Sequence, residues 1–297
     1  MIKEKKFLLI FNPAANMGRA AKMIPLVEEF FNKWKINYHL AVTKRPYEAE
    51  NIAREKANKY DIIVVLGGDG TINEVVNGLI GKNVVLAIVP LGSGNDFAKA
   101  LGLKKKLKDN LEIILMGQEK KVDIGQVNQR YFVNVLGIGF DALVAQEMFA
   151  RPRFLKGLPV YFYSLLKALK KYNFINVKII SEKNIKKEKE LLMLAIANGN
   201  FFGGGFKITP RASIVDGFFD ICLVEKMTRG YLLKNISKLI KGIHHELPEV
   251  NFFQSKNLVI ESKKELPVEY DGEILKGQKK LEIKILPQAL KVITLKE

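Results

Sequence analysis

The sequence predicts two domains: an N-terminal α/β domain with a doubly wound, mostly parallel sheet, and a separate C-terminal domain of mostly antiparallel strands with a few helices. Three observations predict this class. The chain has 297 residues, which is enough for two domains. Its first hundred residues alternate apolar runs rich in Val and Ile with amphipathic segments. Beyond Lys121, short strand-like runs cluster instead.

The N-terminal part alternates strand and helix in chain order. Strands are expected at 6–11, 36–43, 61–66 and 84–90, and helices at 18–34, 47–60, 71–80 and 95–102. Apolar strands separated by helices form parallel sheets that are covered on both faces, and ligands bind beyond the carboxyl ends of such strands. The glycine-rich loops that follow these strands should therefore collect on one edge of the sheet.

The C-terminal part is expected to be mostly antiparallel. Residues 121–140 are typical of a hairpin, and residues 175–199 of two strands joined by a basic turn. Further strands are expected at 216–224, 257–262, 267–274 and 280–286, and helices around 141–172 and 228–242, with His244 and His245 at an exposed helix end. The predicted domain boundaries are 1–122 and 123–288.

The segment "VVLGGDGTINEVVNGL", residues 64–79, is typical of a phosphate-binding loop. Thr71 and Glu74 have capping-box spacing, so a helix should begin just after the glycines and offer free N–H groups to an anion. Asp69 would repel phosphate unless a cation intervened, which predicts Mg²⁺ or a metal-bound water at this loop. The alternative is a tight turn in which Asp69 caps the helix.

Two further loops repeat this design. "VPLGSGNDFAKAL" places Ser93 to Asp96 at the start of another helix, and "FNPAANMG" follows the first strand. Commoner phosphate motifs fail, because Gly81-Lys82 is followed by Asn83 rather than Ser or Thr. "GIGFDA" matches a dinucleotide pattern, but no acid stands between Met148 and Ser181 where that fold needs one. Three related loops on one edge therefore predict a nucleotide site of another kind.

The charge balance predicts an anionic partner. Lys and Arg number 48 against 31 Asp and Glu, a net charge of +17, which suits nucleic acid, an anionic membrane or a phosphate-bearing substrate. No nucleic-acid recognition motif is present, so we expect no nucleic acid partner. Cys222 is the only cysteine, which excludes an intrachain disulfide and favours the cytoplasm. No apolar run is long enough to span a membrane.

Residues 148–181 contain no acid. Seven basic residues lie there among aromatic residues and leucines: Arg151, Arg153, Lys156, Lys167, Lys170, Lys171 and Lys178. Such a stretch suits the surface of an anionic bilayer, which predicts peripheral membrane association. The alternative is a helix that packs on the core and exposes its basic residues to water.

Two Asp-Gly turns also contain candidate functional acids. Asp271 and Glu273 flank Gly272, and a bend there could aim both acids into a cleft; the alternative is an ordinary D-G turn with solvated acids. Asp216-Gly217 has the same two interpretations.

Seven motifs together resemble the soluble bacterial diacylglycerol kinase family. They are "FNPAANMG", "GGDGTINEVVNGL", "PLGSGNDFAKALG", "VDIG", "NVLGIGFDALV", "PRASIVDGFFDI" and "YDGE", in the family's order and over almost the whole chain. That family is related to sphingosine kinases and more distantly to NAD kinases and phosphofructokinases. The resemblance implies that the α/β domain binds ATP and that the second domain is an antiparallel β-sandwich. It also implies that ATP lies in the cleft between the domains and that strand 289–297 returns to complete the first domain.

The resemblance also implies roles for individual residues. Nucleotide contacts are implied at Asn12, Pro13, Ala14, Ala15, Asn16, Thr43, Gly67, Gly68, Asp69, Gly70, Thr71, Ile72, Asn73 and Ser93. Asn16 stands where the family usually has glycine, and asparagine is the next-best residue for a left-handed backbone. The implied catalytic residues are Glu273 as the base, with Asp271 and Asp69. A structural Mg²⁺ is implied at Asp216 and the main-chain oxygens of Ser213 and Phe218.

The leading hypothesis is an ATP- and Mg²⁺-dependent lipid kinase that phosphorylates a lipid hydroxyl, with diacylglycerol converted to phosphatidic acid as the first choice. A soluble-substrate kinase of the NAD kinase type and a non-enzymatic, nucleotide-responsive membrane-binding protein are the alternatives. The sequence leaves the lipid open among diacylglycerol, phosphatidylglycerol, a sphingoid base and a polyprenyl alcohol. An edge strand of the second domain would allow a homodimer.

Overall fold

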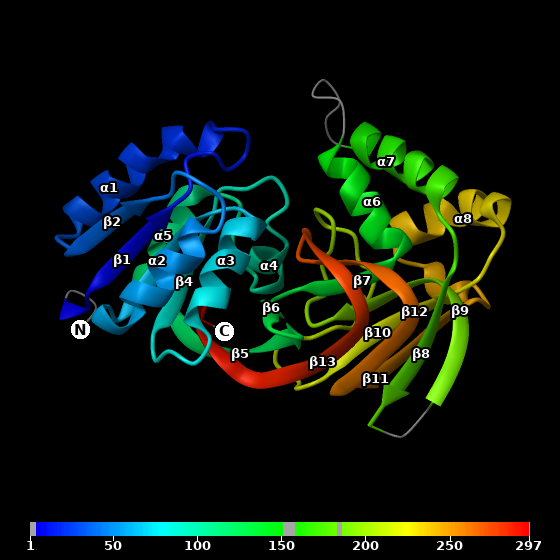
Figure 1. Cartoon of the computed structure of the whole chain (residues 1–297). Coiled ribbons are helices and arrows are strands. Elements are labelled where there is room, and N and C mark those ends of the chain that lie inside the picture. The colour runs from blue at the N-terminus through cyan, green and yellow to red at the C-terminus, as the bar shows by residue number, and fades with distance from the viewer. Residues whose placement is uncertain (1–3, 151–157, 183–185, 297) are drawn as a thin grey trace.

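The computed structural model describes residues 4–150, 158–182 and 186–296, which form two lobes (Figure 1). The N-terminal lobe is an α/β layer structure and the C-terminal lobe is built mainly of antiparallel strands, as the sequence predicts. Within the described residues, no helix combines the length and the apolar character that crossing a bilayer would demand.

The N-terminal lobe has a parallel sheet of order β4-β3-β1-β2. Its strands are β1 (Phe7–Phe11), β2 (Tyr38–Val42), β3 (Ile62–Gly67) and β4 (Val85–Pro90). Its helices are α1 (Ile24–Lys33), α2 (Glu48–Lys56), α3 (Asp69–Leu79), α4 (Asp96–Ala100) and α5 (Leu107–Met116), with short 3-10 turns at Arg19–Met23 and Ala57–Lys59. The four expected strands and four expected helices are confirmed. Helix α5 was not predicted.

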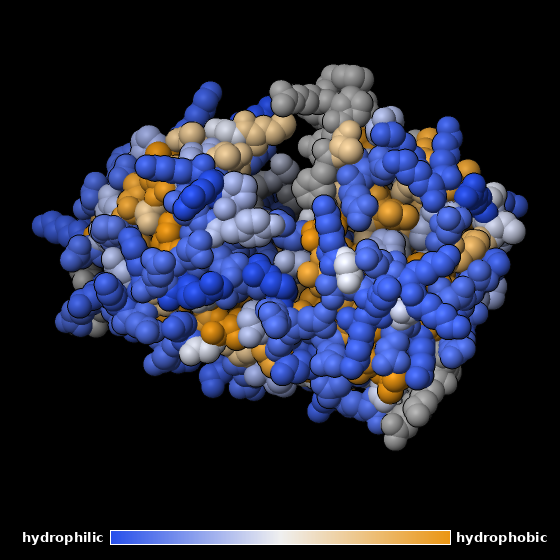
Figure 2. Space-filling view, in the orientation of Figure 1, coloured by the Kyte–Doolittle hydropathy of each residue, from blue (hydrophilic) through white to orange (hydrophobic). Residues whose placement is uncertain are grey.

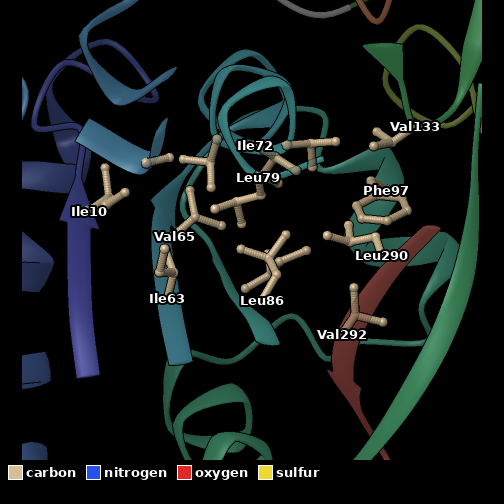
Figure 3. Close-up of a cluster of buried hydrophobic side chains, with 14 of the residues drawn as sticks. Ile10, Ile63, Val65, Ile72, Leu79, Leu86, Phe97, Val133, Leu290 and Val292 are labelled. Carbon is tan, nitrogen blue, oxygen red and sulfur yellow. The ribbon is translucent and has the colours of Figure 1, made fainter. Parts of the chain in front are cut away.

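Alternation along the buried strands explains why helices cover both faces of this sheet. Leu8 and Ile10 of β1 face a core that includes Ile72 and Val76 of α3 and Phe97 of α4. Figure 3 shows part of this core, where Leu290 and Val292 from the end of the chain join it. The alternate positions of β1 face the opposite core, which α1 and α5 cover.

The capping box predicted for α3 is wrong. The helix begins at Asp69, two residues before Thr71, and no side chain caps its first N–H groups. Glu74 Oε2 instead accepts the N–H of Ala49, 3.1 Å away at the start of α2. Thr71 Oγ1 accepts a hydrogen bond from the neighbouring loop. Glu74 and Thr71 therefore bond to residues that are distant in sequence instead of forming the local capping bonds that their spacing predicts.

The C-terminal lobe is a sandwich of bent antiparallel strands. The strands are β5 (Gln118–Val127), β6 (Arg130–Phe132), β7 (Val135–Gly139), β8 (Ile175–Ser181), β9 (Lys186–Ala197), β10 (Phe219–Glu225), β11 (Val250–Ser255), β12 (Asn257–Tyr270) and β13 (Glu273–Thr294). The predicted β5–β6 hairpin and the predicted β8–β9 pair are both confirmed. Apolar side chains of β7, β9, β10, β12 and β13 fill the space between the layers.

Helices α6 (Phe140–Phe149), α7 (Leu158–Lys171) and α8 (Arg229–Lys241) cover one side of the sandwich. On α7, Leu165, Ala168 and Leu169 are buried against the sandwich. Lys167 and Lys171 both contact Glu147 of α6, at 3.2 and 2.6 Å. The described part of the acid-free stretch is therefore a packed helix with paired lysines. Arg151, Arg153 and Lys156 lie outside the described residues.

The expectation for the two histidines is half wrong. His244 lies in a short 3-10 turn (His244–Glu246) and is buried, with its Nε2 2.8 Å from the carbonyl oxygen of Ile208. His245 is exposed. Burial lowers the pKa of His244, so its imidazole is a neutral core group.

Strand β13 joins the two lobes. It pairs antiparallel with β12 and β5, and its end, Lys291–Val292, pairs in parallel with Val85–Leu86 of β4. The β13–β5 ladder is interrupted between Leu286 and Leu290. Within this bulge Gln288 has a φ of 52°, and its N–H donates to Asp123 Oδ1 at 2.7 Å.

Candidate active site

The three predicted loops meet at the carboxyl edge of the parallel sheet. Asn12, just after β1, donates from Nδ2 to Thr71 Oγ1 at 2.9 Å, which joins the first loop to α3. Thr43, just after β2, bonds through its N–H to the carbonyl of Phe11 at 2.8 Å. Ser93, in the third loop, donates to Asn16 Oδ1 at 3.3 Å. Residues far apart in sequence are therefore in contact at one edge.

The loop at Asn16 keeps the left-handed shape that glycine would give it. Asn16 has a φ of 52°, and Met17 and Gly18 follow with φ of 56° and 81°. The side chain of Asn16 points to Ser93 rather than away from the site. This explains how asparagine substitutes for glycine here.

Asp69 caps the helix that neighbours its own. Its carboxylate accepts the N–H groups of Asn95 and Asp96, each at 2.6 Å, at the start of α4. Burial raises the pKa of the Asp69 carboxyl, and the nearby Asp96 raises it further. Asp96 in turn accepts the N–H of Gly204 at 2.7 Å, from the C-terminal lobe. Asp69 therefore holds the second and third loops together.

Most of the glycines in these loops are required by the contact between the loops. A Cβ on Gly67 would stand 2.6 Å from Thr71 Cβ, and one on Gly92 would stand 2.5 Å from the Cα of Gly68. A Cβ on Gly94 would stand 2.7 Å from Asp69 Oδ2. At Gly70 the nearest atom would be Glu273 Oε1, 3.9 Å away. Gly70 is thus the glycine that faces the opposite lobe.

The two acids of the 271–273 turn point in different directions. The Asp271 carboxylate accepts the N–H groups of Val133, Asn134 and Val135 at 2.6, 2.9 and 3.2 Å, and the Nδ2 of Asn73 at 2.9 Å. Burial raises its pKa to about 6. The expectation that both acids aim into the cleft is wrong for Asp271, because left-handed φ values at Asp271 (48°) and Gly272 (89°) separate the two side chains.

Glu273 faces the glycine loop across the cleft. Its Oε2 accepts a hydrogen bond from the Tyr47 hydroxyl at 3.2 Å, and its Oε1 faces Gly70. The Glu273 charge is the main cause that raises the pKa of Tyr47. This arrangement places a carboxylate, which accepts a hydrogen bond from one hydroxyl, next to the N-terminus of α3. Such a carboxylate can accept a proton from a group bound in the cleft.

An ion pair fixes the lobes beside this acid. Arg130 of β6 binds Glu50 of α2 through two hydrogen bonds of 3.2 and 2.9 Å, and its Nε donates to the Tyr270 hydroxyl at 3.2 Å. The fork geometry defines both distance and angle between the partners. Sequence reasoning missed this pair and Tyr47, because their partners lie 80 and 226 residues away.

The predicted metal loop lies apart from the glycine loops. Asp216 is exposed, and its Oδ1 accepts the N–H of Phe218 at 3.0 Å. The adjacent Asp123 accepts the N–H of Gly217 at 2.7 Å. Within the described ranges, no group of three or more His, Cys, Asp or Glu side chains is placed to hold a metal ion. One carboxylate with main-chain oxygens is a hard donor set, which fits a largely hydrated Mg²⁺.

Two buried acids that sequence reasoning did not select lie beside the site. Asp141 of α6 and Glu269 of β12 are 7% and 1% exposed and line a cavity of about 280 Å³. Burial raises the pKa of Asp141 to about 7 and that of Glu269 well above its usual value. The "GIGFDA" motif contains Asp141, but Glu269 lies 128 positions later and no motif links them.

Two family models cover the chain. Residues 6–127 match the model described as the diacylglycerol kinase catalytic domain. Residues 134–294 match the model described as the YegS C-terminal NAD kinase beta sandwich-like domain.

Relatives and solved structures named as diacylglycerol kinases agree with these models. The chain is 28% identical to a diacylglycerol kinase of Staphylococcus carnosus over 99% of this chain and 96% of the relative. It is 29% identical to one from Staphylococcus epidermidis, over 91% and 86%. A crystal structure of a diacylglycerol kinase from Bacillus anthracis superposes with a TM-score of 0.72 at 25% identity, covering 98% of this chain and 97% of that one.

Proposed function

This chain belongs to the family of bacterial diacylglycerol kinase-like lipid kinases, and on that premise we propose that it transfers the γ-phosphoryl group of ATP to a lipid hydroxyl with the help of Mg²⁺. Diacylglycerol is the proposed acceptor and phosphatidic acid the proposed product. Glu273 is the proposed general base. The observation that carries the proposal is the position of Glu273, which reaches from one lobe to the glycine loop of the other.

The residues divide the work in a way that phosphoryl transfer requires. Positioning and charge stabilisation dominate such reactions, and a base near the hydroxyl adds to them. The N-terminus of α3 and the loops at Asn12 and Ser93 would hold the phosphates. Glu273 Oε1 would take the proton of the acceptor hydroxyl. Asp271, with four donors on its carboxylate, would fix the turn that aims Glu273.

Mg²⁺ would neutralise charge on the phosphates as they move. A second, structural Mg²⁺ would be held by Asp216 with the main-chain oxygens of Ser213 and Phe218, completed by water. Asp69 has both carboxylate oxygens on main-chain N–H groups, so we assign it a positioning role at the phosphate loops.

The lipid would be reached at an anionic bilayer surface from the cytoplasm. The net charge of +17 supports this, because a basic protein is concentrated at anionic lipid. Figure 2 shows a surface that is mostly hydrophilic on the face drawn, with a hollow between the lobes. Exposed Lys170 and half-exposed Leu166 of α7 offer one described point of contact.

The test is incubation of the protein with labelled ATP, Mg²⁺ and vesicles that contain diacylglycerol. We expect labelled phosphatidic acid, and its loss when a chelator removes Mg²⁺. Labelled soluble product that does not depend on vesicles would favour a kinase of the NAD kinase type. ATP binding and salt-sensitive vesicle binding without any labelled product would favour the non-enzymatic alternative. Either result would contradict the proposal.

A further inference from the structure

A mostly apolar pocket opens beside the turn that carries Glu273. Its walls come from α6, β9 and the 201–208 segment, and Asp69, Asp96 and Gly272 also line it. The apolar lining residues are Phe140, Val144, Ala145, Met148, Met193, Phe201, Phe202, Phe206 and Ile208. A ligand in this pocket would therefore lie next to the proposed base and the phosphate loops.

The polar end of this pocket holds oxygen atoms without partners. Asn134 Oδ1, Asp141 Oδ2 and Glu269 Oε1 are buried, and no described residue of the chain donates a hydrogen bond to them. All three residues line the pocket and are at least nine-tenths buried. A buried polar atom without a partner costs about 1–3 kcal/mol, so folded proteins seldom retain three in one place without a ligand or water to satisfy them.

Asp141 and Glu269 present their unpaired oxygens to the same point. A Cβ placed on Gly137 would stand 2.3 Å from Asp141 Oδ2 and 2.8 Å from Glu269 Oε1. The remaining oxygens bond only to main-chain N–H groups, of Ala142 and Gly272, each at 2.9 Å. Two buried carboxyl groups that face one point repel each other when both are charged, which favours a form of the pair that keeps one proton. The pair therefore retains a proton and can donate as well as accept.

The charges around the pocket are one-sided. Five acids line it, namely Asp69, Asp96, Asp141, Glu269 and Asp271, and no Lys, Arg or His is among its described lining residues. Two described cations lie beside the lining, where Lys99 and Lys207 stack on the ring of Phe201 at 5.8 and 5.4 Å, and Lys99 is paired with Asp96. Because the five acids outnumber these two lysines, a phosphate-bearing headgroup would meet net repulsion here.

We propose that this pocket binds the acceptor lipid and that Asp141 and Glu269 are its specificity-determining residues, selecting an uncharged headgroup with hydroxyl and ester oxygens against a phosphate-bearing one. This inference rests on the proposed function and narrows its substrate class. The shared proton donates to an ester oxygen of the headgroup, the acceptor hydroxyl stays free to donate to Glu273, and the apolar walls contact the first carbons of the acyl chains.

The first experiment blocks the pocket. Ala145→Trp places a large ring among the lining residues, and Leu26→Trp, at an exposed position of α1 in the other lobe, is the matched control. Binding of dioctanoylglycerol is measured by calorimetry, alongside ATP binding. We expect at least a tenfold weaker lipid affinity for Ala145→Trp only, with ATP affinity unchanged in both. Equal lipid affinity of a folded Ala145→Trp and the unmodified protein would overturn the assignment of the pocket.

The second experiment tests the acids. The isosteric double variant Asp141→Asn/Glu269→Gln removes the shared proton and the charge while it keeps the volume. We expect the KM for dioctanoylglycerol to rise about tenfold with little change in kcat, and the preference for dioctanoylglycerol over dioctanoyl-phosphatidylglycerol to fall about tenfold. Glu112→Gln on α5 removes one distant charge and should change neither. An unchanged preference in the double variant would overturn the role of the pair.

The two proposals fail in different ways. If the unmodified protein labels no lipid but binds dioctanoylglycerol in an Ala145-dependent way, the proposed kinase function fails and the pocket assignment stands. If it labels lipids while both sets of variants behave like the unmodified protein, the kinase function stands and this inference fails.

Discussion

The carboxyl edge of the parallel sheet and the pocket in the sandwich lobe differ in whether their polar groups have hydrogen-bond partners within the protein. At the sheet edge, Asn12 bonds Thr71, Asp69 bonds the start of α4, and the loops pack glycine against glycine. In the pocket, oxygens of Asn134, Asp141 and Glu269 have no protein partner. The first region is complete before a ligand arrives, whereas the second keeps polar groups that a ligand can satisfy.

The 271–273 turn lies between these regions and contains one acid of each kind. Asp271 has four donors and serves the scaffold, whereas Glu273 has one described donor, Tyr47, and faces the opposite lobe. If this difference reflects function, replacing Glu273 should lower kcat, and replacing Asp271 should lower the free energy of unfolding.

The largest effect should come from Glu273→Gln. The amide cannot take a proton, so we expect kcat for lipid phosphorylation to fall by about 10³-fold, within the range for loss of a general base. ATP affinity should change less than about threefold and the free energy of unfolding by less than about 0.5 kcal/mol. Glu282→Gln, an exposed acid on the same strand, is the control. A variant that retains more than a tenth of the activity would remove Glu273 from the role of base.

Asp271→Ala should produce the largest loss of stability. Three main-chain N–H groups and the Asn73 amide would lose their acceptor, and we expect the free energy of unfolding at pH 7.5 to fall by about 3 kcal/mol. Urea unfolding followed by circular dichroism measures this. If Glu273→Gln destabilised the protein as much as Asp271→Ala, the contrast between the two acids would be lost.

Asp141→Asn should stabilise the protein in a way that depends on pH. Because the pKa of Asp141 is raised from 3.8 to about 7 in the folded state, the unfolded state ionises first as pH rises. The folded protein therefore loses stability between about pH 4 and 7, and the variant avoids that loss. We expect it to be more stable by about 4 kcal/mol at pH 8, with little difference at pH 4. An equal difference at both pH values would contradict this explanation.

The smallest expected effect is a difference in stability between alanine substitutions at Gly92 and at Gly70. Gly92→Ala forces a Cβ against the Cα of Gly68, and we expect a loss of about 1–2 kcal/mol in the free energy of unfolding, with weaker ATP binding. Gly70→Ala has room for its Cβ and should leave stability within about 0.5 kcal/mol. Its methyl group narrows the space before Glu273, so we expect a lower kcat. Equal stability losses would show that the loops are not packed as described.

The sequence was informative wherever a structure depends on neighbouring residues. The apolar period placed β1 to β4, and the strand-to-helix pattern placed the glycine-rich loops at one edge of the sheet. The left-handed backbone at Asn16 followed from the glycine that the resembling family has there and from the tolerance of asparagine for that conformation. The motifs also selected Glu273, although the direction of its side chain depends on the φ values of two residues in the turn.

The sequence was less informative wherever distant segments compete for the same groups. Glu74 has the spacing of a capping box, but its carboxylate accepts the N–H of Ala49 instead. His244 looked like an exposed helix end, but the 208 carbonyl holds it in the interior. The Asp141–Glu269 pair forms only when α6 packs on β12, and no local pattern predicts that contact.

Strand β13 also limits how the cleft can open. A pair of strands bends most readily where its backbone hydrogen bonds are interrupted. In the β13–β5 pair that place is Gln288, whose N–H donates to Asp123. Glu273 begins the same strand, at the far end of a lever of up to roughly 50 Å at about 3.3 Å per residue. A swing of about 5° at this pivot would displace the carboxylate by as much as roughly 4 Å. Fluorescence transfer between labels on the two lobes, compared in the unmodified protein and in Asp123→Asn, would report such a pivot.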